Sequence, residues 1–388
     1  MGGSPCTHWS IAQKNNRETE PEGLGWELFK NYLIAKEKFK PDYFLYENNK
    51  SAAQPIKDQI SRELGYPLQY INSALVSAQN RQRFYCHNIP NVPQPADRGI
   101  LLKDILESGS AWNEKSYALT ASYNGAVAWN TIERKQRTMV AEPIRIGNSG
   151  SNSQGDRVYS PYGKSITLCG NGGGKGAKTG LYACPINDID GKARTIKSQY
   201  AKTSIANLTY KASYGATMVV ETWDGKTYPI YEVQNGLITI NDKQFPIKLP
   251  DGYYIIRKLT VLECCRLQTF PDNYFIKADG TILVSNAQAY RQLGNSWTVE
   301  VIKHLLSHIP NLQDCDIEVL SMYDGISAGQ LALERLGANV ITYKATEIDK
   351  YCITTTQYHY PKTIQLGDAF QVREPYWQYD NGQLRLSI

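Results

Sequence analysis

The sequence predicts an α/β fold interrupted by a β-rich insertion, and three observations support this. Helical and strand patterns alternate over residues 1 to about 90 and return from residue 257 onward, as in α/β folds. The intervening residues, 98–256, are rich in Gly, Ser, Asn, Lys and Tyr, with only short apolar runs. Finally, a strand, a glycine turn and a helix follow one another over residues 317–337. We therefore expect regions at 1–97, 98–256 and 257–388.

The overall composition indicates a globular protein of a reducing cytoplasm. The 388 residues are 41% hydrophobic, and no run approaches the ~18 apolar residues of a membrane span. Eight cysteines are scattered without a C-x-x-C pair, which favours free thiols and predicts no metal site. A net charge of +5 permits nucleic-acid binding without requiring it. The excess of 27 tyrosines over 8 phenylalanines suits a polar recognition surface.

The first region contains three candidate reactive segments. "MGGSPC" places Cys6 in a turn stiffened by Pro5, where it is either a frayed terminal thiol or a nucleophile. "FKPDYFLYENN" is an apolar strand with Glu47 at its end, a position where burial favours the neutral carboxyl. In "SAQNRQRFY", Arg81 and Arg83 are two residues apart and are expected on one side of a strand.

The middle region shows turn signals and one false motif. "WDGKTYPIYEVQNGLITI" contains Asp224-Gly225 and Asn235-Gly236, both typical of two-residue hairpins. "GGGKGAKT" has the look of a phosphate-binding loop, but Ala177 stands where that motif requires Gly. We therefore reject a phosphate-binding loop here.

The last region predicts an adenosine pocket. "DIEVLSMYDGISAGQLALERLG" is a strand to Tyr323, a turn containing Gly325 and a helix that ends before Gly337. The next strand ends in Glu347, at the distance where nucleotide-binding α/β folds hold ribose hydroxyls. "LGDAF" supplies Asp368 at a third strand end. The spacing departs from G-x-G-x-x-G, which disfavours NAD, and a glycine turn without a ligand remains the alternative.

Together, these segments resemble the motifs of DNA (cytosine-5) methyltransferases, especially phage enzymes and the mammalian de novo enzymes. The shared motifs are "SMYDGISAGQLALERLG", "GGSPC", "LYENN", "SAQNRQRFY", "RKLTVLECCRLQTFPDNY" and "RQLGNSW". The family runs from cofactor loop to nucleophile loop, whereas here the cofactor half comes last. The resemblance thus implies a Rossmann-like S-adenosylmethionine-dependent methyltransferase domain, circularly permuted, with an inserted target-recognition domain. In that arrangement "GQLRLSI" becomes the strand that precedes Cys6, beside the strand that carries Asp324.

The resemblance also implies the catalytic roles. A cytosine is flipped out of the duplex, the Cys6 thiolate adds to its C6, and C5 then accepts the methyl group. Glu47 is implied as the donor near N3. Arg83, with Arg81 beside it, is implied to hold the base. Residues 7–25 are implied to form a loop that closes over the base.

The implied cofactor is S-adenosyl-L-methionine, with no metal. The implied cofactor-binding residues are Tyr323, Asp324, Gly325, Ile326, Ser327, Glu347, Ile348, Asp368, Asn295 and Ser296.

The segment "SQGDRVYSPYGKSITLCGNGGGKGAKTGLY" resembles the DNA-reading region of bacterial enzymes that modify the inner cytosine of GCGC. Gln154 is implied to fill the space of the flipped base or to touch the orphan guanine. Arg157 is implied to bind a guanine edge, Thr167 to lie near the backbone and Gly173 to approach a phosphate. We expect a monomer that acts on double-stranded DNA, with a cognate restriction endonuclease as a candidate partner. The alternatives are a catalytically silent DNA-binding relative, which would lack Cys6 or Glu47, and a tRNA cytosine-5 methyltransferase.

Overall fold

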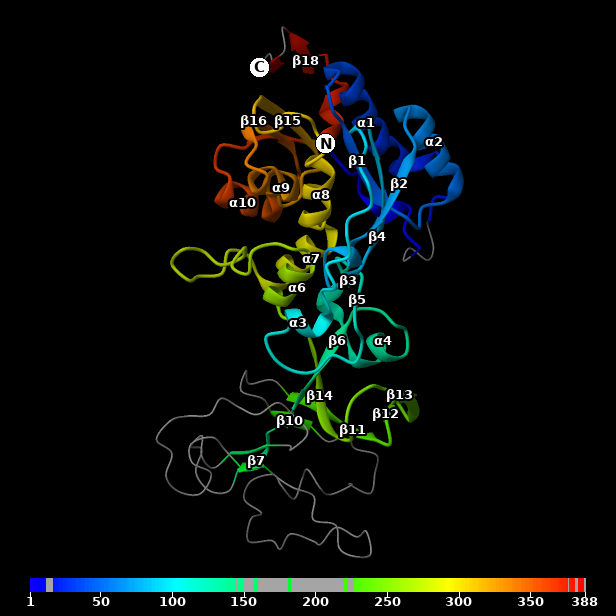
Figure 1. Ribbon diagram of the computed structural model, residues 1–388, viewed down its shortest axis with the longest axis vertical. Helices are drawn as coiled ribbons and strands as arrows, with labels where there is room; N and C mark the ends of the chain where they lie inside the picture. The colour runs from blue at the N-terminus through cyan, green and yellow to red at the C-terminus, as the bar shows by residue number, and fades with distance from the viewer. Residues whose placement is uncertain are drawn as a thin grey trace, which may run out of the picture. The chain divides into compact units, whose positions relative to one another are not determined.

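The chain is described here from a computed structural model (Figure 1). The described residues are 1–11, 17–143, 145–148, 157–159, 181–182, 219–221, 227–375, 377–380 and 383–386. They divide into two compact units. Unit 1 comprises residues 1–101, 115–125 and 261–388, and unit 2 comprises residues 102–114 and 126–260.

Unit 1 has alternating helices and strands. Its strands are β1 (Leu45–Asn49), β2 (Leu68–Asn72), β3 (Gln79–Asn80), β4 (Gln82–His87), β5 (Ser116–Tyr117), β15 (Asp316–Met322), β16 (Asn339–Thr346), β17 (Ile364–Gly367), β18 (Trp377–Asp380) and β19 (Gln383–Leu386). Its α-helices are α1 (Gly23–Phe39), α2 (Gln54–Leu64), α6 (Val261–Leu267), α7 (Asn286–Asn295), α8 (Val299–Leu306), α9 (Ala328–Arg335) and α10 (Lys350–His359). Its short 3₁₀ turns are η1 (Cys6–His8), η2 (Ser73–Leu75), η3 (Tyr123–Gly125) and η6 (Ala369–Arg373).

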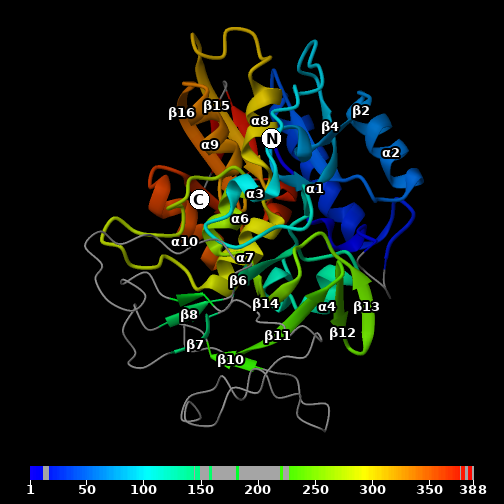
Figure 2. The ribbon, with the colours of Figure 1, turned by 60° about the horizontal axis from the view of Figure 1, so that its bottom comes forward.

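Two three-stranded sheets meet at the N-terminal segment of the chain. One is the parallel sheet β15-β16-β17, and the other is the antiparallel sheet β1-β4-β2. Gly2 forms parallel bridges to Met322 at the end of β15 and to Tyr46 in β1. Figure 2 shows β15 and β16 with α8, α9 and α10 nearby. The predicted strand, turn and helix at 317–337 are confirmed as β15 and α9, and Gly337 adopts φ +68° after the helix.

The C-terminal strand is not where the sequence placed it. β19 pairs antiparallel with β18, so the prediction that it lies beside the strand carrying Asp324 is wrong. Only Asn381-Gly382, a pair typical of tight hairpins, separates the two strands, and local pairing satisfies them without a distant partner. The Met1 amino group instead donates to Leu320 O (2.8 Å), and Met322 N donates to Met1 O (2.9 Å). A groove of about 680 Å³ lies next to Met1, and its lining includes residues of β15 and the segment that leads into β1.

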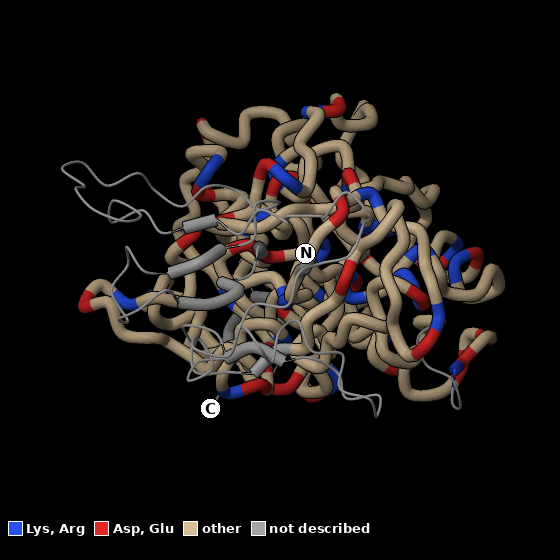
Figure 3. Tube along the Cα trace, turned by 90° about the horizontal axis from the view of Figure 1, so that it is seen from below, with Lys and Arg blue, Asp and Glu red and all other residues tan. Residues whose placement is uncertain are grey.

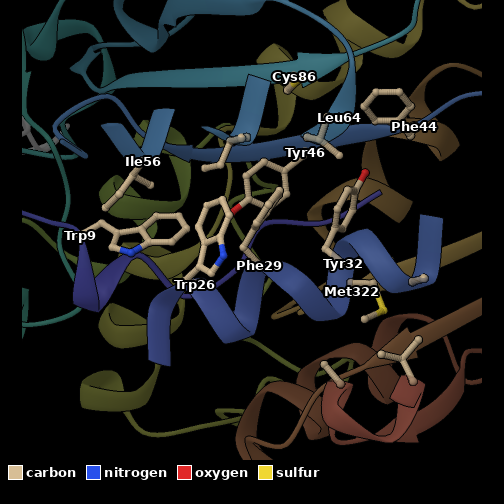
Figure 4. Close-up of a cluster of buried hydrophobic side chains, with 14 of the residues drawn as sticks. Trp9, Trp26, Phe29, Tyr32, Phe44, Tyr46, Ile56, Leu64, Cys86 and Met322 are labelled. Atoms are coloured by element: carbon tan, nitrogen blue, oxygen red, sulfur yellow. The ribbon is translucent and has the colours of Figure 1, made fainter. Parts of the chain in front are cut away.

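A mainly aromatic cluster lies on one side of β1 (Figure 4). Tyr46 of β1 packs against Phe29 and Tyr32 of α1, with ring centroids 5.2 and 5.0 Å apart. Trp9 of the N-terminal loop and Met322, which lies far from α1 along the sequence, are buried in the same cluster. The cluster thereby joins the N-terminal loop, β1 and the end of β15 in one core.

Unit 2 is rich in β structure, as the sequence predicted for the middle of the chain. Its elements are α3 (Leu102–Ile105), α4 (Ala128–Ile132), β6 (Met139–Pro143), β7 (Arg145–Asn148), β8 (Arg157–Tyr159), β9 (Leu181–Tyr182), β10 (Val219–Glu221), β11 (Thr227–Gln234), β12 (Leu237–Ile240), β13 (Lys243–Pro246) and β14 (Gly252–Lys258). The main sheet has the order β13-β12-β11-β14-β6, and β10 also pairs with β11. Asn235 and Gly236 both adopt positive φ (52° and 69°) between β11 and β12, which confirms the predicted hairpin. The second predicted hairpin, Asp224-Gly225, lies outside the described residues.

Candidate active site

The segment before Cys6 is laid along β1. Gly2 N donates to Leu45 O (2.9 Å) and Glu47 N donates to Gly2 O (3.0 Å). A Cβ on Gly3 would lie 2.9 Å from Glu47 O and 3.0 Å from Glu47 Oε2, so the backbone approaches this closely only because the residue is glycine. The Ser4 hydroxyl bonds with that of Tyr46 (2.7 Å), and Asn48 Nδ2 donates to Ser4 O (3.0 Å). The chain start is therefore fixed against β1.

Cys6 begins the 3₁₀ turn η1 and is half-buried. Its carbonyl accepts from Trp9 N (3.2 Å) and Ser10 N (3.0 Å), which closes the turn. Trp9 is fully buried in the aromatic cluster and anchors the far side of the turn. Of the two readings of Cys6, these contacts oppose a frayed terminal thiol and favour a positioned one.

The segment that follows Cys6 is tied by Glu18. Glu18 Oε2 accepts from Trp9 Nε1 (3.1 Å), and both carboxylate oxygens lie within hydrogen-bond distance of Gly25 N near the start of α1. His8 Nδ1 lies 3.4 Å from Glu18 Oε1. Residues 12–16 of the predicted closing loop lie outside the described residues, so the closing motion stays a prediction.

Three side chains from distant segments converge at the end of β1. Glu47 is only 8% exposed. Arg83 Nε of β4 lies 2.9 Å from Glu47 Oε1, and Trp297 Nε1 donates to Glu47 Oε2 (2.9 Å). The sequence placed Glu47 and Arg83 in one site, and the structure brings them together as an ion pair. Trp297 was missed, because a contact 250 residues away leaves no local pattern.

Arg81 makes structural contacts beside this site, and its catalytic role stays a prediction. Its guanidinium is buried and donates to the carbonyls of Leu119 (2.8 Å), Gly294 (3.1 Å) and Ser296 (2.8 Å). Arg81 also lies between β3 and β4 rather than inside a strand, so the period-of-two argument fails there. Burial, followed by the like charge of Arg83, lowers the pKa of Arg81, whereas Glu47 and Cys6 raise it. Arg81 thus supports the backbone after α7.

The glycine turn of the last region forms a second site. Gly325 has φ +62°, and no atom lies within 4 Å of where a Cβ would be. Glu347, directly after β16, accepts from the backbone N–H groups of Gly325 (2.9 Å), Ile348 (2.8 Å) and Asp349 (2.8 Å). Burial raises the pKa of Glu347, and these three donors oppose that shift. A half-buried carboxylate is therefore held beside an open glycine turn.

Asp324 is held by side chains beside the same turn. Tyr343 OH donates to Asp324 Oδ1 (2.7 Å), and Ser327 Oγ donates to Asp324 Oδ2 (2.5 Å). Burial raises the pKa of Asp324, and the nearby Met1 amino group opposes that shift. Burial lowers the pKa of the Met1 amino group itself to about 5.

The other predicted cofactor-binding residues divide into structural and accessible ones. Tyr323 OH donates to Leu28 O (2.7 Å) of α1, so this ring is used in packing. The Ile326 side chain is buried and its carbonyl accepts from Tyr274 (2.8 Å), while Ser296 is buried beside Arg81. The side chains of Asn295, Ile348 and Asp368 are exposed, with Ile348 at 74%. Ile348, which directly follows Glu347, therefore presents an exposed apolar side chain next to the Glu347 carboxylate.

The predicted DNA-reading residues fall largely outside the described part of the chain. Gln154, Thr167 and Gly173 lie outside it. Arg157 begins β8. In the described trace, Lys and Arg are interspersed with Asp and Glu, in keeping with the small net charge (Figure 3).

The described residues contain neither a candidate metal site nor a candidate membrane-spanning helix. None of the described residues form a group of three or more His, Cys, Asp or Glu that could hold a metal ion. Among the described helices, none has the length and hydropathy needed to cross a membrane.

Comparison with known proteins gives consistent matches. The family model described as C-5 cytosine-specific DNA methylase matches residues 1–311. The orphan methyltransferase M.SPRI of Bacillus phage SPR is 24% identical over 381 residues, covering 80% of this chain and 81% of its own length. The type II methyltransferase M.HhaI of Haemophilus parahaemolyticus is 26% identical over 334 residues, covering 79% and 74%. A solved DNMT2 structure from Spodoptera frugiperda aligns over 79% of this chain and 77% of that one, with 16% identity and a TM-score of 0.36.

Proposed function

The chain belongs to the C-5 cytosine-specific DNA methylases, which use S-adenosylmethionine as methyl donor, and from this premise we propose that its own reaction runs through Cys6, Glu47 and Arg83. The observation that carries the proposal is the convergence of Glu47, Arg83 and Gly3 of the nucleophile segment at the end of β1. The silent DNA-binding alternative loses its support, since both Cys6 and Glu47 are present and positioned.

In this reaction the Cys6 thiolate attacks C6 of a flipped cytosine, and electron density moves toward C5 and N3. C5 would then take the methyl group of S-adenosylmethionine, with S-adenosylhomocysteine as the leaving group. Glu47 contacts the base near N3, where negative charge develops, and Arg83 keeps the local charge balanced. In the last step the C5 proton passes to solvent water, and the electron pair of the C5–H bond re-forms the C5–C6 double bond and expels the Cys6 thiolate.

The second site fits the cofactor. The Glu347 carboxylate would accept ribose hydroxyls, and exposed Ile348 offers an apolar face to adenine. Gly325 leaves open space at the turn, and Asp368 stands at the end of the neighbouring strand β17. Asp324 would face the charged amino group of the methionine part. Bound there, S-adenosylmethionine supplies an electrophilic methyl group.

We further propose that the chain is circularly permuted. The family model matches residues 1–311, and the strand, turn and helix with Asp324 come after that range. Met1 and Gly2 lie between β15 and β1, where the bridges to both strands are parallel. A break in the chain at this point leaves the nucleophile segment in register with both sheets.

DNA recognition is proposed for residues 98–256, with Gln154, Arg157, Thr167 and Gly173 as contact residues and a GCGC-like target. The enzyme would act as a monomer in a reducing cytoplasm, and a cognate restriction endonuclease is a candidate partner. These assignments follow from the resemblance and from the β-rich character of unit 2.

Bisulfite sequencing tests the function and the target together. DNA from cells expressing the parent protein should show cytosine protected from conversion at one recurring sequence, and DNA from cells expressing Cys6→Ala should show none. Protection that is equal in both, or absent in both at matched protein levels, would overturn the proposal. Protection confined to tRNA would favour the tRNA alternative instead.

A further inference from the structure

Trp297 contacts Glu47 from a segment far from it in the sequence. It lies between the C-terminal end of α7 and the start of α8, and its indole N–H donates to Glu47 Oε2 at 2.9 Å. Arg83 takes the other carboxylate oxygen at the same distance. Each oxygen of this nearly buried carboxylate therefore has a donor from a different segment.

The backbone on both sides of Trp297 is fixed. Ser296 O accepts from Arg81 Nη2 (2.8 Å) on one side. On the other side, Thr298 Oγ1 donates to Gln268 Oε1 (2.8 Å) and bonds with Ser73 Oγ (2.9 Å). Since all of these partners are buried, the residues on either side of Trp297 are held by the core of the unit.

The ring reaches both halves of the site. A Cβ on Gly3, in the nucleophile segment, would lie 3.3 Å from Trp297 Nε1. A Cβ on Gly329, in the first turn of α9, would lie 3.5 Å from Trp297 Cζ3. The indole therefore lies close to the nucleophile segment at Gly3 and within van der Waals distance of the helix that follows the Gly325 turn.

We propose that Trp297 is a positioning residue for the methylation reaction: its N–H orients Glu47 toward the base, and its ring links that orientation to the cofactor turn. A carboxylate on a flexible side chain samples several rotamers, and two donors at right distances restrict it to one. An indole is a donor only, so it cannot compete with Glu47 for a proton. The inference rests on the proposed function, because it requires Glu47 to act on the base.

A packing role alone would also satisfy the indole N–H, as buried tryptophans usually find a partner. The two roles differ in what they predict when Glu47 is already altered. A positioning role is exerted through Glu47 and disappears without its carboxylate, whereas a packing role persists.

The test is a double-mutant cycle of Trp297→Phe and Glu47→Gln, read as kcat for methyl transfer to duplex DNA. Trp297→Phe keeps an aromatic ring and removes the N–H, and it should lower kcat about 10- to 100-fold while the KM values change less than about 3-fold. On the Glu47→Gln background the same change should cost less than about 3-fold. Trp297→His, which retains a ring N–H, should keep more activity than Trp297→Phe.

Trp26→Phe is the control for loss of an indole, since Trp26 is buried in the aromatic cluster on α1 away from Glu47. It should leave kcat within about 2-fold. Equal losses from Trp297→Phe in both backgrounds, or an unchanged kcat, would overturn the proposal. A parent protein that methylates nothing would instead refute the proposed function, so the two failures are distinguishable.

Discussion

The two carboxylates of the site, Glu347 and Glu47, are held in different ways. Glu347 is held by three backbone N–H groups, all from within 22 residues along the chain. Glu47 is held by the side chains of Arg83 and Trp297, one on the neighbouring strand β4 and the other 250 residues away. The proposed cofactor side is therefore built by local backbone, and the proposed base side by side chains from other segments of the chain.

This difference has consequences for substitution. Backbone donors survive most changes of side chain, so the cofactor side should lose affinity in modest steps. The proposed base side depends on the buried ion pair between Glu47 and Arg83. Removing either side chain leaves the charge of the other one buried and unpaired. We expect the largest effects on the base side.

Glu47→Gln should give the largest loss. The amide cannot replace the carboxylate beside Arg83, and we expect kcat to fall about 10²- to 10⁴-fold, the usual contribution of a positioned acid or base. Binding of DNA and S-adenosylmethionine, measured by fluorescence and calorimetry, should change only a few-fold. A kcat within 3-fold of the parent would remove Glu47 from the mechanism.

Glu347→Ala should show the opposite kinetic pattern. Losing the carboxylate that accepts from the ribose costs roughly 1–3 kcal/mol in total, so S-adenosylmethionine affinity should fall about 5- to 150-fold. At saturating cofactor, kcat should stay within a few-fold. Unchanged cofactor affinity by calorimetry would contradict the assignment of this pocket.

Gly2→Ala tests the junction between the two sheets. The new Cβ would lie 2.8 Å from Met322 O and 2.9 Å from Tyr32 Cδ2, so one of them must move. We expect a loss of about 1–3 kcal/mol in unfolding free energy, together with lower activity, because Gly2 leads directly into the Cys6 turn. Gly280→Asn is the matched control: Gly280 has φ +79° with no atom within 4 Å, and Asn tolerates that φ. If Gly2→Ala and Gly280→Asn had the same melting temperature, the close packing around Gly2 would not limit the stability of the junction.

Deletion of residues 383–388 should give the smallest effect. β19 pairs with β18, and the described contacts under Cys6 come from Met1, Gly2 and Ser4. We expect methylation within 2-fold of the parent and a small change in thermal unfolding. A large loss of both would return these residues to a supporting role under Cys6.

The same contrast between local and remote contacts explains what the sequence could predict. The sequence correctly predicted strand β15, the glycine turn and the Asn235-Gly236 hairpin. It also correctly placed Glu347 and Asp368 directly after strands. Each of these features depends on a pattern within about 20 neighbouring residues. A shared site for Glu47 and Arg83 was expected from the family resemblance, whereas their direct ion pair was not predicted.

The sequence is less informative where remote packing decides. Arg81 and Arg83 were expected on one side of a strand, but Arg81 lies between β3 and β4 and its guanidinium donates to three backbone carbonyls. The C-terminal strand was placed beside the strand carrying Asp324 from the family resemblance, and it pairs with β18 instead. For Trp297, the available signal was a large aromatic residue directly after "RQLGNS", which does not by itself name a partner.

The most direct test of the account is covalent trapping on a duplex that carries 5-fluorocytosine at the target site, with S-adenosylmethionine present. Fluorine at C5 cannot leave as a proton does, so the adduct at C6 should persist and migrate as one species under denaturing conditions. Parent protein and Cys315→Ala, which removes an exposed thiol outside the site, should both form it, with the adduct mapped by mass spectrometry to the peptide containing Cys6. Cys6→Ala should form none while still binding the duplex. An adduct that persists in Cys6→Ala, or that maps to another cysteine, would contradict the account.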